Sequence, residues 1–195
     1  VSEVNEEIFE FGTSGKLYNS NLLMYDKKTD SLWSQALGKA VVGEMTGTEL
    51  ERYPALTTSW KDWKDTYPNG EVLSRDTGIT RDYTRDPYDS YYSNSTILFP
   101  LSHTDGRLDV KKNVYGIEVN GKYKAYTHED VEEAGVINDV VGNKPIVVIF
   151  DTDLNAVRVF YRASDEVYAN EGFEDLEVII HENSFWFSWV ASHPE

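Results

Sequence analysis

The chain has 195 residues, 40% of them apolar and 13% aromatic, which is enough to bury a core and predicts a single domain over residues 1–195. Its formal charge of −16 disfavours nucleic acid and anionic membranes as partners, because both are bound through basic surface. Cysteine is absent and no apolar run is as long as a membrane-spanning helix, so we expect no disulfide, no thiolate metal site and no membrane span.

The first quarter of the chain is typical of a series of short strands. Alternating apolar and acidic residues predict a strand at Ile8–Phe11, and the next apolar run predicts another at Lys16–Tyr25, with Gly12–Gly15 as the turn between them. Further strands are expected at Ser31–Gln35 and Lys39–Met45. Such closely spaced turn signals favour an antiparallel meander.

The middle of the chain carries weaker signals. The hydroxyl residues Thr57, Thr58 and Ser59 offer a cap for a short helix that runs through Lys64, and Pro68 ends it. Two short strands are expected after it, Glu71–Ser74 and Ile97–Leu101.

The second half contains the clearest hairpin signals. Asn120-Gly121 lies between the runs Val114–Val119 and Lys122–Tyr126 and is typical of a two-residue hairpin turn. The two most apolar runs, Ile146–Phe150 and Ala156–Tyr161, predict the central hairpin of the sheet.

Two helices and one more strand are expected in this half. Thr127 and Asp130 match a capping box, which predicts a helix over His128–Ala134. Leu176–Ile180 is predicted as a strand and Ser184–Ser192 as a closing aromatic helix. The whole pattern predicts an α+β fold with a predominantly antiparallel sheet, either open or curled towards a barrel, and a few short helices.

Two tryptophan-rich segments share one pattern, W-x2-W-x3-Y/H-P, at Trp60–Pro68 and Trp186–Pro194. Tryptophan is rare, so agreement at four positions predicts a weak internal repeat. A hydroxyl residue suited to helix capping precedes each copy, Ser59 and Ser184. Residues i and i+3 share a helix face, so the paired indoles are expected in the core, with a ring-stacking ligand platform as the alternative.

The segment Leu73–Tyr92 is the strongest candidate for a functional site. It combines three arginines, four aspartates and four tyrosines without an apolar period, which predicts an ordered polar loop of the kind that carries binding groups. Such a loop can hold a carboxylate or a sugar hydroxyl, or its charges can simply pair with one another and brace it. The candidate binding residues are Arg75, Asp76, Arg81, Tyr83, Asp86 and Tyr88.

Metal and nucleotide motifs are weak or absent. Asp151–Asn155 imitates the opening of a calcium loop, but Ala156 and Arg162 stand where glycine and glutamate are needed. The four histidines have no ligand spacing, and neither a phosphate-binding loop nor a serine-hydrolase elbow is present. We therefore predict no metal site and no cofactor, and leave a divalent cation open as a partner of this acidic chain.

Several longer motifs resemble one family. The prokaryotic domain of unknown function 3179 family has a signature similar to Phe11–Asp26, Ser31–Gln35, Leu73–Gly78, Asp86–Tyr88, Val136–Asp139 and Ser184–Trp189. The resemblance spans nearly the whole chain. It implies no activity, since the family has none established, and it implies a place outside the cytoplasm, because members are often exported or membrane-anchored.

The resemblance also raises the question of assembly. Members usually carry a further segment before the FG-x-SG motif, similar to Lys124–Arg162, whereas this chain begins ten residues ahead of Phe11. If those strands come from elsewhere, an exposed sheet edge is expected, and such edges recruit strands from other chains. The stretch Val4–Phe11 would then complete a neighbouring subunit of a homo-oligomer or filament.

Two functions follow as hypotheses. We favour a non-enzymatic domain outside the cytoplasm that binds a small ligand or assembles with partner subunits by strand exchange, because aromatic residues abound and no catalytic frame is recognisable. The alternative is a carboxylate-based hydrolase or lyase with its site in the Leu73–Tyr92 loop, which would use Asp76, Asp82 or Asp86 together with Arg75 and Tyr83. A pocket lined by the loop residues would favour ligand chemistry.

Overall fold

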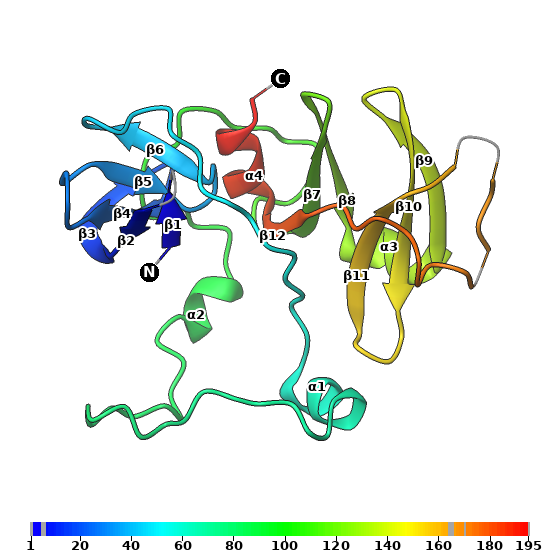
Figure 1. Ribbon diagram of the computed structural model, residues 1–195, viewed down its shortest axis with the longest axis horizontal. Coiled ribbons are helices and arrows are strands. Elements are labelled where there is room, and N and C mark those ends of the chain that lie inside the picture. Colours follow the sequence, from blue (N-terminus) through cyan, green and yellow to red (C-terminus); the bar gives the residue numbers. More distant parts are fainter. Residues whose placement is uncertain (1, 5–6, 164–165, 170, 195) are drawn as a thin grey trace.

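The computed structural model describes residues 2–4, 7–163, 166–169 and 171–194 and shows an α+β fold (Figure 1). Every strand pair in these residues is antiparallel, as predicted. No closed barrel forms within the described ranges, so of the two expected arrangements the open one is confirmed. The strands gather into two groups, with a long irregular segment below them in Figure 1.

The N-terminal lobe, residues 2–50, holds a two-stranded and a four-stranded sheet. The four strands of the larger sheet pair in chain order, which confirms the predicted meander. Its core centres on Trp33, which is fully buried, with the rings of Phe9 and Phe11 edge-on at 6.3 and 5.5 Å. The strands are β1 (Ser2–Val4), β2 (Glu7–Phe9), β3 (Phe11–Tyr18), β4 (Asn21–Asp26), β5 (Leu32–Ser34) and β6 (Lys39–Val42).

A buried carboxylate closes the turn between β4 and β5. Asp26 is 0% exposed and accepts hydrogen bonds from the Trp33 indole at 2.8 Å and from the backbone N–H of Thr29 at 2.6 Å. Burial alone raises the pKa of Asp26, but these hydrogen bonds outweigh burial and hold the pKa below its ordinary 3.8. The charged form of Asp26 is therefore part of the folded lobe.

The first turn of the meander differs from the prediction. β3 runs straight through Gly12–Gly15, with a register shift inside it, and the chain reverses at Asn19 and Ser20. Both of these residues have positive φ, 49° and 63°, which is the conformation that a tight two-residue hairpin turn requires. The two glycines mark an irregularity in the strand and not its end.

The C-terminal lobe, residues 113–192, contains two three-stranded sheets with the orders β12-β7-β8 and β11-β10-β9. The Asn120-Gly121 hairpin is confirmed, with φ of 50° and 70° at the two turn residues. The predicted hairpin of β10 and β11 forms, but only β10 is central in its sheet. β11 lies at one edge, and β9, which was not predicted, lies at the other. The strands are β7 (Asn113–Val119), β8 (Lys122–Thr127), β9 (Val136–Val141), β10 (Lys144–Asp151), β11 (Ala156–Tyr161) and β12 (His181–Phe185).

Helix α3 (His128–Ala134) and its cap are confirmed residue for residue. The Thr127 hydroxyl accepts from the backbone N–H of Asp130 at 3.1 Å, as the capping box predicts. The helix places Val131 in the main core, fully buried among side chains of β7, β10 and β11.

Helix α4 (Trp186–Ser192) packs on β7. Alternation along β7 sends Tyr115 and Ile117 into the main core, while Val114 and Gly116 face the helix. A Cβ atom at Gly116 would lie 2.1 Å from Cζ3 of Trp189, so only glycine allows this approach.

The two copies of the tryptophan repeat have the same local structure and opposite burial. Helices α1 (Trp60–Thr66) and α4 both begin on the first tryptophan, and the residue after each helix donates its N–H to the carbonyl of the second tryptophan. The ring of that residue lies tilted against the second indole in both, with centroids 4.5 Å apart in α1 and 4.2 Å apart in α4. The expected core packing holds for α4, where Trp186 is 5% exposed, and fails for α1, where Trp60 is 55% exposed. Common ancestry of the copies stays a prediction.

One of the two predicted helix caps forms and the other does not. Ser59 caps α1 by accepting from the backbone N–H of Asp62 at 3.1 Å. Ser184 does not cap α4, because the cap position is Phe185 and Ser184 lies one residue earlier, inside β12. Its hydroxyl oxygen is buried and has no hydrogen-bond partner within the described residues.

Between the lobes, residues 51–112 form a long exposed segment that contains α1 and the single turn α2 (Asp89–Tyr92). The strands predicted at Glu71–Ser74 and Ile97–Leu101 are wrong, since both stretches are irregular and largely exposed. The strand predicted at Leu176–Ile180 is also wrong: one bridge from Val178 to Phe160 forms there, and regular pairing begins only at His181. None of the helices in the described part of the chain is long and apolar enough to cross a bilayer.

Candidate functional site

The predicted loop Leu73–Tyr92 lies on the outside of the molecule. Tyr83 contacts the hydroxyl of Thr77 at 3.3 Å, and Asp86 accepts from the backbone N–H of Tyr88 at 2.8 Å. No ion pair joins the described side chains of this loop, so its arginines do not brace it through its aspartates. The six candidate residues are all exposed: Arg75, Asp76, Arg81, Tyr83, Asp86 and Tyr88.

Local hydrogen bonds set the protonation of one loop aspartate. The side chain and the backbone N–H of Thr84 both bond to Asp82, at 2.6 and 2.9 Å, and lower the pKa of Asp82. The carboxylate is therefore a hydrogen-bond acceptor at neutral pH and a weaker base than an isolated aspartate.

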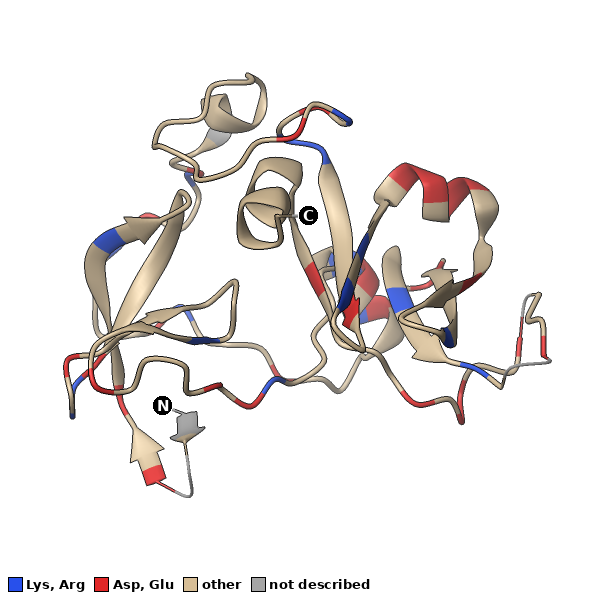
Figure 2. Cartoon of the chain, turned by 90° about the horizontal axis from the view of Figure 1, so that it is seen from above, with Lys and Arg blue, Asp and Glu red and all other residues tan. Residues whose placement is uncertain are grey.

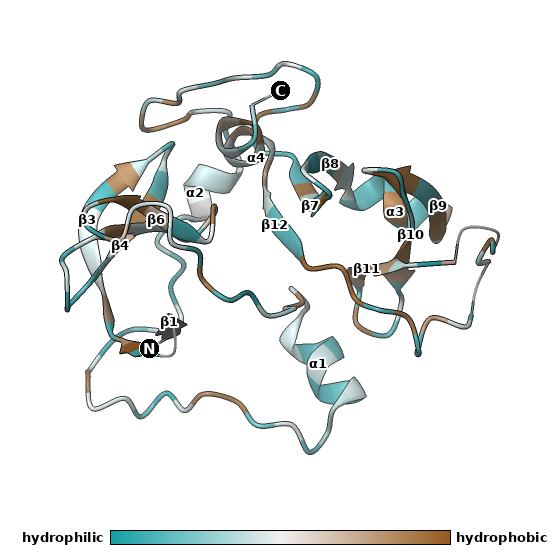
Figure 3. Ribbon diagram, turned by 45° about the horizontal axis from the view of Figure 1, so that its top comes forward, coloured by the Kyte–Doolittle hydropathy of each residue, from teal (hydrophilic) through white to brown (hydrophobic). Residues whose placement is uncertain are grey.

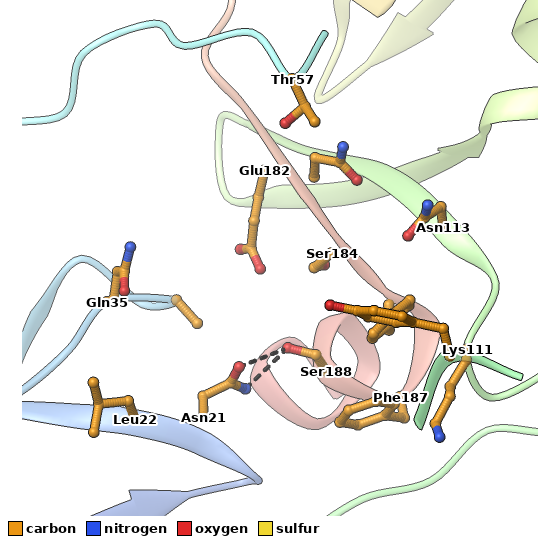
Figure 4. Close-up of a pocket in the computed structure, with 14 residues that line it drawn as sticks. Asn21, Leu22, Gln35, Thr57, Lys111, Asn113, Glu182, Ser184, Phe187 and Ser188 are labelled. Atoms are coloured by element: carbon orange, nitrogen blue, oxygen red, sulfur yellow. Dashed lines mark hydrogen bonds between the residues drawn. The ribbon is translucent and has the colours of Figure 1, made fainter. Parts of the chain in front are cut away.

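A cleft of about 860 Å³ lies between the two lobes, at the edge of strand β12. The N-terminal lobe contributes the start of β4 and the turn after β5, and the C-terminal lobe contributes β12 and the first half of α4. Figure 4 shows the Glu182 carboxylate pointing into this space between Gln35 and Ser184, while the Lys111 amine points away from it. Aromatic side chains close one side, namely Tyr92, Phe185 and Phe187.

Two asparagines of the N-terminal lobe form hydrogen bonds with helix α4 beside the cleft. Asn19, in the first turn of the meander, donates to the carbonyl of Ala191 at 2.8 Å and accepts from the N–H of Ser102 at 2.8 Å. Asn21 donates to the hydroxyl of Ser188 at 2.9 Å, and that hydroxyl is 3.3 Å from the Asn21 carbonyl oxygen (Figure 4). Both contacts join β4 or its turn to α4, so the N-terminal sheet is held against the C-terminal helix.

Other polar groups at the cleft are left unused by the fold. The exposed amides of Gln35, Asn113 and Asn183 take part in no hydrogen bond within the described residues. The Ser184 hydroxyl is buried and equally without a partner there. Buried polar atoms are nearly always satisfied, so this hydroxyl beside a cavity is available to a water molecule or a ligand.

A second cavity of about 910 Å³ continues along the same edge towards β11 and is strongly acidic. It shares Gln35, Ala36 and Glu182 with the first cleft. Glu182 is 4.0 Å from the His193 ring nitrogen. The other carboxylates that line this cavity make no ion pair with a described cation: Glu49, Glu51, Glu118 and Glu177.

A tyrosine and a histidine form a hydrogen-bonded pair beside a smaller cavity of about 460 Å³. The Tyr115 hydroxyl is 3.1 Å from Nδ1 of His128, and Nε2 of His128 is 3.8 Å from Glu132. Burial, and to a lesser degree the charge of Glu129, raise the pKa of Tyr115. The phenol therefore keeps its proton and can donate to Nδ1 of His128 in the tautomer that carries its proton on Nε2.

His181, at the start of β12, also packs on Tyr115, with ring centroids 5.6 Å apart. Burial lowers the pKa of His181, although a hydrogen bond with the backbone of Ile179 opposes part of that shift. Its neutral form is thus favoured in the folded protein.

No metal centre emerges from the described part of the chain, where no three His, Asp or Glu side chains converge. The calcium-like turn is used structurally: Asp151 accepts from the N–H of Leu154 at 3.0 Å and lies 3.5 Å from the Arg158 guanidinium. These contacts brace the β10–β11 hairpin.

The cleft residues were missed in the sequence because they come from distant elements. Their one visible signal is the strand β12 itself, His-Glu-Asn-Ser-Phe, in which polar residues occupy positions on both faces. Figure 3 shows β12 as hydrophilic, directly after an apolar stretch. β12 lies at the edge of its sheet, where polar side chains are common, so its composition alone did not mark the cleft.

Comparison with known proteins identifies the family and no closer relative. The searches of curated proteins and of solved structures found no match. One family model, described as protein of unknown function (DUF3179), matches residues 1–195. This match confirms the resemblance drawn from the motifs, and the chain belongs to the DUF3179 family.

Proposed function

We propose that this chain is a non-enzymatic binding domain that takes a small ligand in the cleft between its lobes. The observation that carries the proposal is the set of unused hydrogen-bonding groups at the cleft, the amides of Gln35, Asn113 and Asn183 and the hydroxyl of Ser184. Ligand sites typically combine apolar walls with a few convergent polar groups. The aromatic side and the amide side of the cleft supply both.

The negative charge of the cleft and of the whole chain determines which class of ligand is favoured. Glu182 points into the cleft, Lys111 points away from it, and the chain as a whole carries −16. Acidic residues also outnumber basic ones on both lobes (Figure 2). A ligand that brings hydrogen-bond donors or a positive charge is therefore favoured over an anion. Polyols, sugars and amines meet this requirement.

The location outside the cytoplasm and assembly by strand exchange belong to the same proposal. Their support is the family resemblance and the principle that free sheet edges recruit strands. Within the chain β1 already pairs with β2, and residues 5 and 6 of the proposed exchanging stretch lie outside the described residues. Particle mass measured before and after deletion of residues 1–7 tests exchange, and an unchanged mass contradicts it.

The binding test is a titration with a ligand panel. Neutral sugars and polyols, primary amines and matched carboxylates are added to the purified protein, and binding is followed by amide chemical shifts and calorimetry. Asn183→Ala is expected to weaken binding about fivefold to tenfold, since one hydrogen bond contributes about 1 kcal/mol. Asn69→Ala removes an exposed amide that lies outside the cleft and serves as the matched control.

Two results would contradict the proposal. Either no member of the panel shifts a cleft residue at millimolar concentration, or Asn69→Ala weakens binding as much as Asn183→Ala. The first outcome would show that the cleft binds none of these compounds. The second would show that binding does not depend on the cleft.

A second candidate function, a hydrolase or lyase, is favoured by one specific observation. The Tyr115–His128 pair offers a hydrogen-bonded acid and base beside a cavity, whereas the loop carboxylates first considered for this chemistry are exposed. Turnover of ester, amide or glycoside probes that disappears in His128→Gln and survives in Asp82→Asn would support this candidate. Loss of turnover in Asp82→Asn would instead indicate that the active site lies in the Leu73–Tyr92 loop.

A further inference from the structure

The unused amides of the cleft differ in their hydrogen-bonding needs from a charged group. Gln35, Asn113 and Asn183 line the cleft, and their amides take part in no hydrogen bond within the described residues. A primary amide offers N–H donors and a carbonyl acceptor side by side. A hydroxyl group both donates and accepts, whereas an ammonium group only donates and a carboxylate only accepts. Hydroxyl groups therefore match these amides more fully than an amine or an acid does.

An aromatic ring with free surface lies in the same cleft. Tyr92, from helix α2, is 53% exposed, and its ring lies tilted against Phe185 with centroids 6.3 Å apart. Both rings line the cleft. The face of an aromatic ring is electron-rich and attracts the polarised C–H groups of a sugar ring. Rings beside amides therefore fit a ligand that has both a C–H face and a rim of hydroxyl groups, as a pyranose has.

The pairing of β12 with β7 leads from the cleft to the smaller cavity of about 460 Å³. Asn183 lies opposite Tyr115 and Asn113 lies two residues before Tyr115, so the three side chains share one face of the strand pair. The smaller cavity lies on this face, beside Tyr115 and His128. Asn113, Asn183 and Thr57 line both this cavity and the cleft. The two cavities therefore adjoin along these residues.

The smaller cavity offers the same chemistry as the cleft. Its lining includes Asn155, in the turn between β10 and β11, whose exposed amide makes no hydrogen bond within the described residues. The cleft alone has about 860 Å³, and sites of about 300 to 1,000 Å³ hold drug-sized ligands. The two adjoining cavities therefore provide room for more than one sugar ring.

We propose that the cleft binds an uncharged oligosaccharide, with one sugar ring on Tyr92 between the amides of Gln35 and Asn183 and a further ring in the cavity beside His128. This inference rests on the proposed function, because it names the ligand class of the same cleft. Glu182 points into the cleft (Figure 4). Its carboxylate accepts hydrogen bonds from sugar hydroxyls and disfavours sugars that carry a carboxylate of their own.

The probes are β-1,4-linked oligosaccharides of glucose, mannose and N-acetylglucosamine, each in lengths of one to four rings. Calorimetry with the full chain gives the affinity, and amide chemical shifts locate the site. We expect at least one series to bind and to shift Asn183. Its affinity should rise at least about fivefold when the chain becomes long enough to enter the smaller cavity, because one added hydrogen bond strengthens binding by about that factor.

Variants at the two ends of the site test its extent. Gln35→Ala removes an amide of the cleft that does not line the smaller cavity, and it should weaken short and long chains alike. Asn155→Gly removes an amide of the smaller cavity and suits the positive φ of 49° at this turn position. It should weaken only the longer chains, by about fivefold. Tyr92→Ala should weaken all of them, and Tyr92→Phe, which keeps the ring, should recover most of the affinity.

Three results would overturn the inference. The first is an affinity that does not rise with chain length in any series, and the second is an equal effect of Asn155→Gly on the shortest and longest chains that bind. The third is an equal loss in Tyr92→Ala and Tyr92→Phe, because the ring would then not be the binding surface. Failure of every oligosaccharide while an amine still binds at Asn183 overturns the inference and leaves the proposed function standing. Failure of all these probes overturns both.

Discussion

The repeated tryptophans allow one stability prediction with an internal control. Trp186 and Trp60 are each the first residue of a seven-residue helix with the same sequence pattern. Trp186 is 5% exposed and Trp60 is 55% exposed. Substitution by alanine at each position changes helix propensity by the same amount, so the difference between the two variants isolates burial.

The magnitude follows from the contacts of Trp186. Its ring packs on Val114 and Trp189, and its indole N–H donates to the carbonyl of Asp105 at 3.0 Å. Removing a buried tryptophan ring destabilises a protein by about 3 to 5 kcal/mol, of which the hydrogen bond accounts for about 1 kcal/mol. We expect Trp60→Ala to lose less than about 1.5 kcal/mol, because half of its ring is already in water.

Urea denaturation followed by circular dichroism measures both variants. Trp186→Ala should lower the midpoint strongly at an unchanged m-value, and its melting temperature should fall by roughly 6 to 20 °C. Trp186→Phe should recover most of the loss, since it keeps an aromatic ring and gives up the hydrogen bond. Equal losses in Trp186→Ala and Trp60→Ala would refute the reasoning, because α1 would then be buried as deeply as α4.

Three further predictions concern single contacts. Gly116→Ala should destabilise by about 1 to 3 kcal/mol because its Cβ would collide with Trp189, whereas Gly106→Ala, in open space, should change stability by less than about 0.5 kcal/mol. The lowered pKa of Asp26 means that its contribution to stability is complete above about pH 4. That contribution is lost as pH falls through the folded-state value, so the acid-side drop in urea midpoint should shrink in Asp26→Asn. The lowered pKa of His181 makes stability fall as pH drops below its ordinary 6.5, and His181→Phe should flatten that part of the pH profile.

Local chemistry explains which elements could be predicted. The Asn120-Gly121 turn and the Thr127 cap depend on residues within four positions of each other, so the sequence alone determines them. The Asn19-Ser20 turn has no such signature. It is stabilised from afar, by bonds from Asn19 to residues 102 and 191, and a nearby glycine pair offered a stronger local signal.

The residues of the cleft are far apart along the chain, so the sequence gives no local signal for it. Its amides and hydroxyls come from β4, from the turn after β5, from β7 and from β12, and the packing of α4 against the N-terminal sheet brings them together. The Leu73–Tyr92 loop was predicted as the site because its charged residues are close together in the sequence. Residues that are adjacent in the sequence form a motif that can be recognised, whereas a cleft forms where distant residues meet in space. In this protein the charged loop and the cleft lie in different parts of the molecule.

Ser184 provides the sharpest way to tell a functional surface from an ordinary edge strand. A buried hydroxyl without a partner destabilises the protein by about 1 to 3 kcal/mol relative to a satisfied one, so Ser184→Ala should leave the free protein equally stable or more stable by about 1 kcal/mol. Ser34→Ala is the matched control: that hydroxyl is also buried but accepts from the N–H of Leu37 at 3.2 Å, and its removal should destabilise. If urea midpoints fall equally in the two variants, the Ser184 hydroxyl is satisfied in solution and serves the fold. If Ser184→Ala instead gains stability while losing affinity for whichever probe binds the cleft, the residue is retained for binding at the expense of stability.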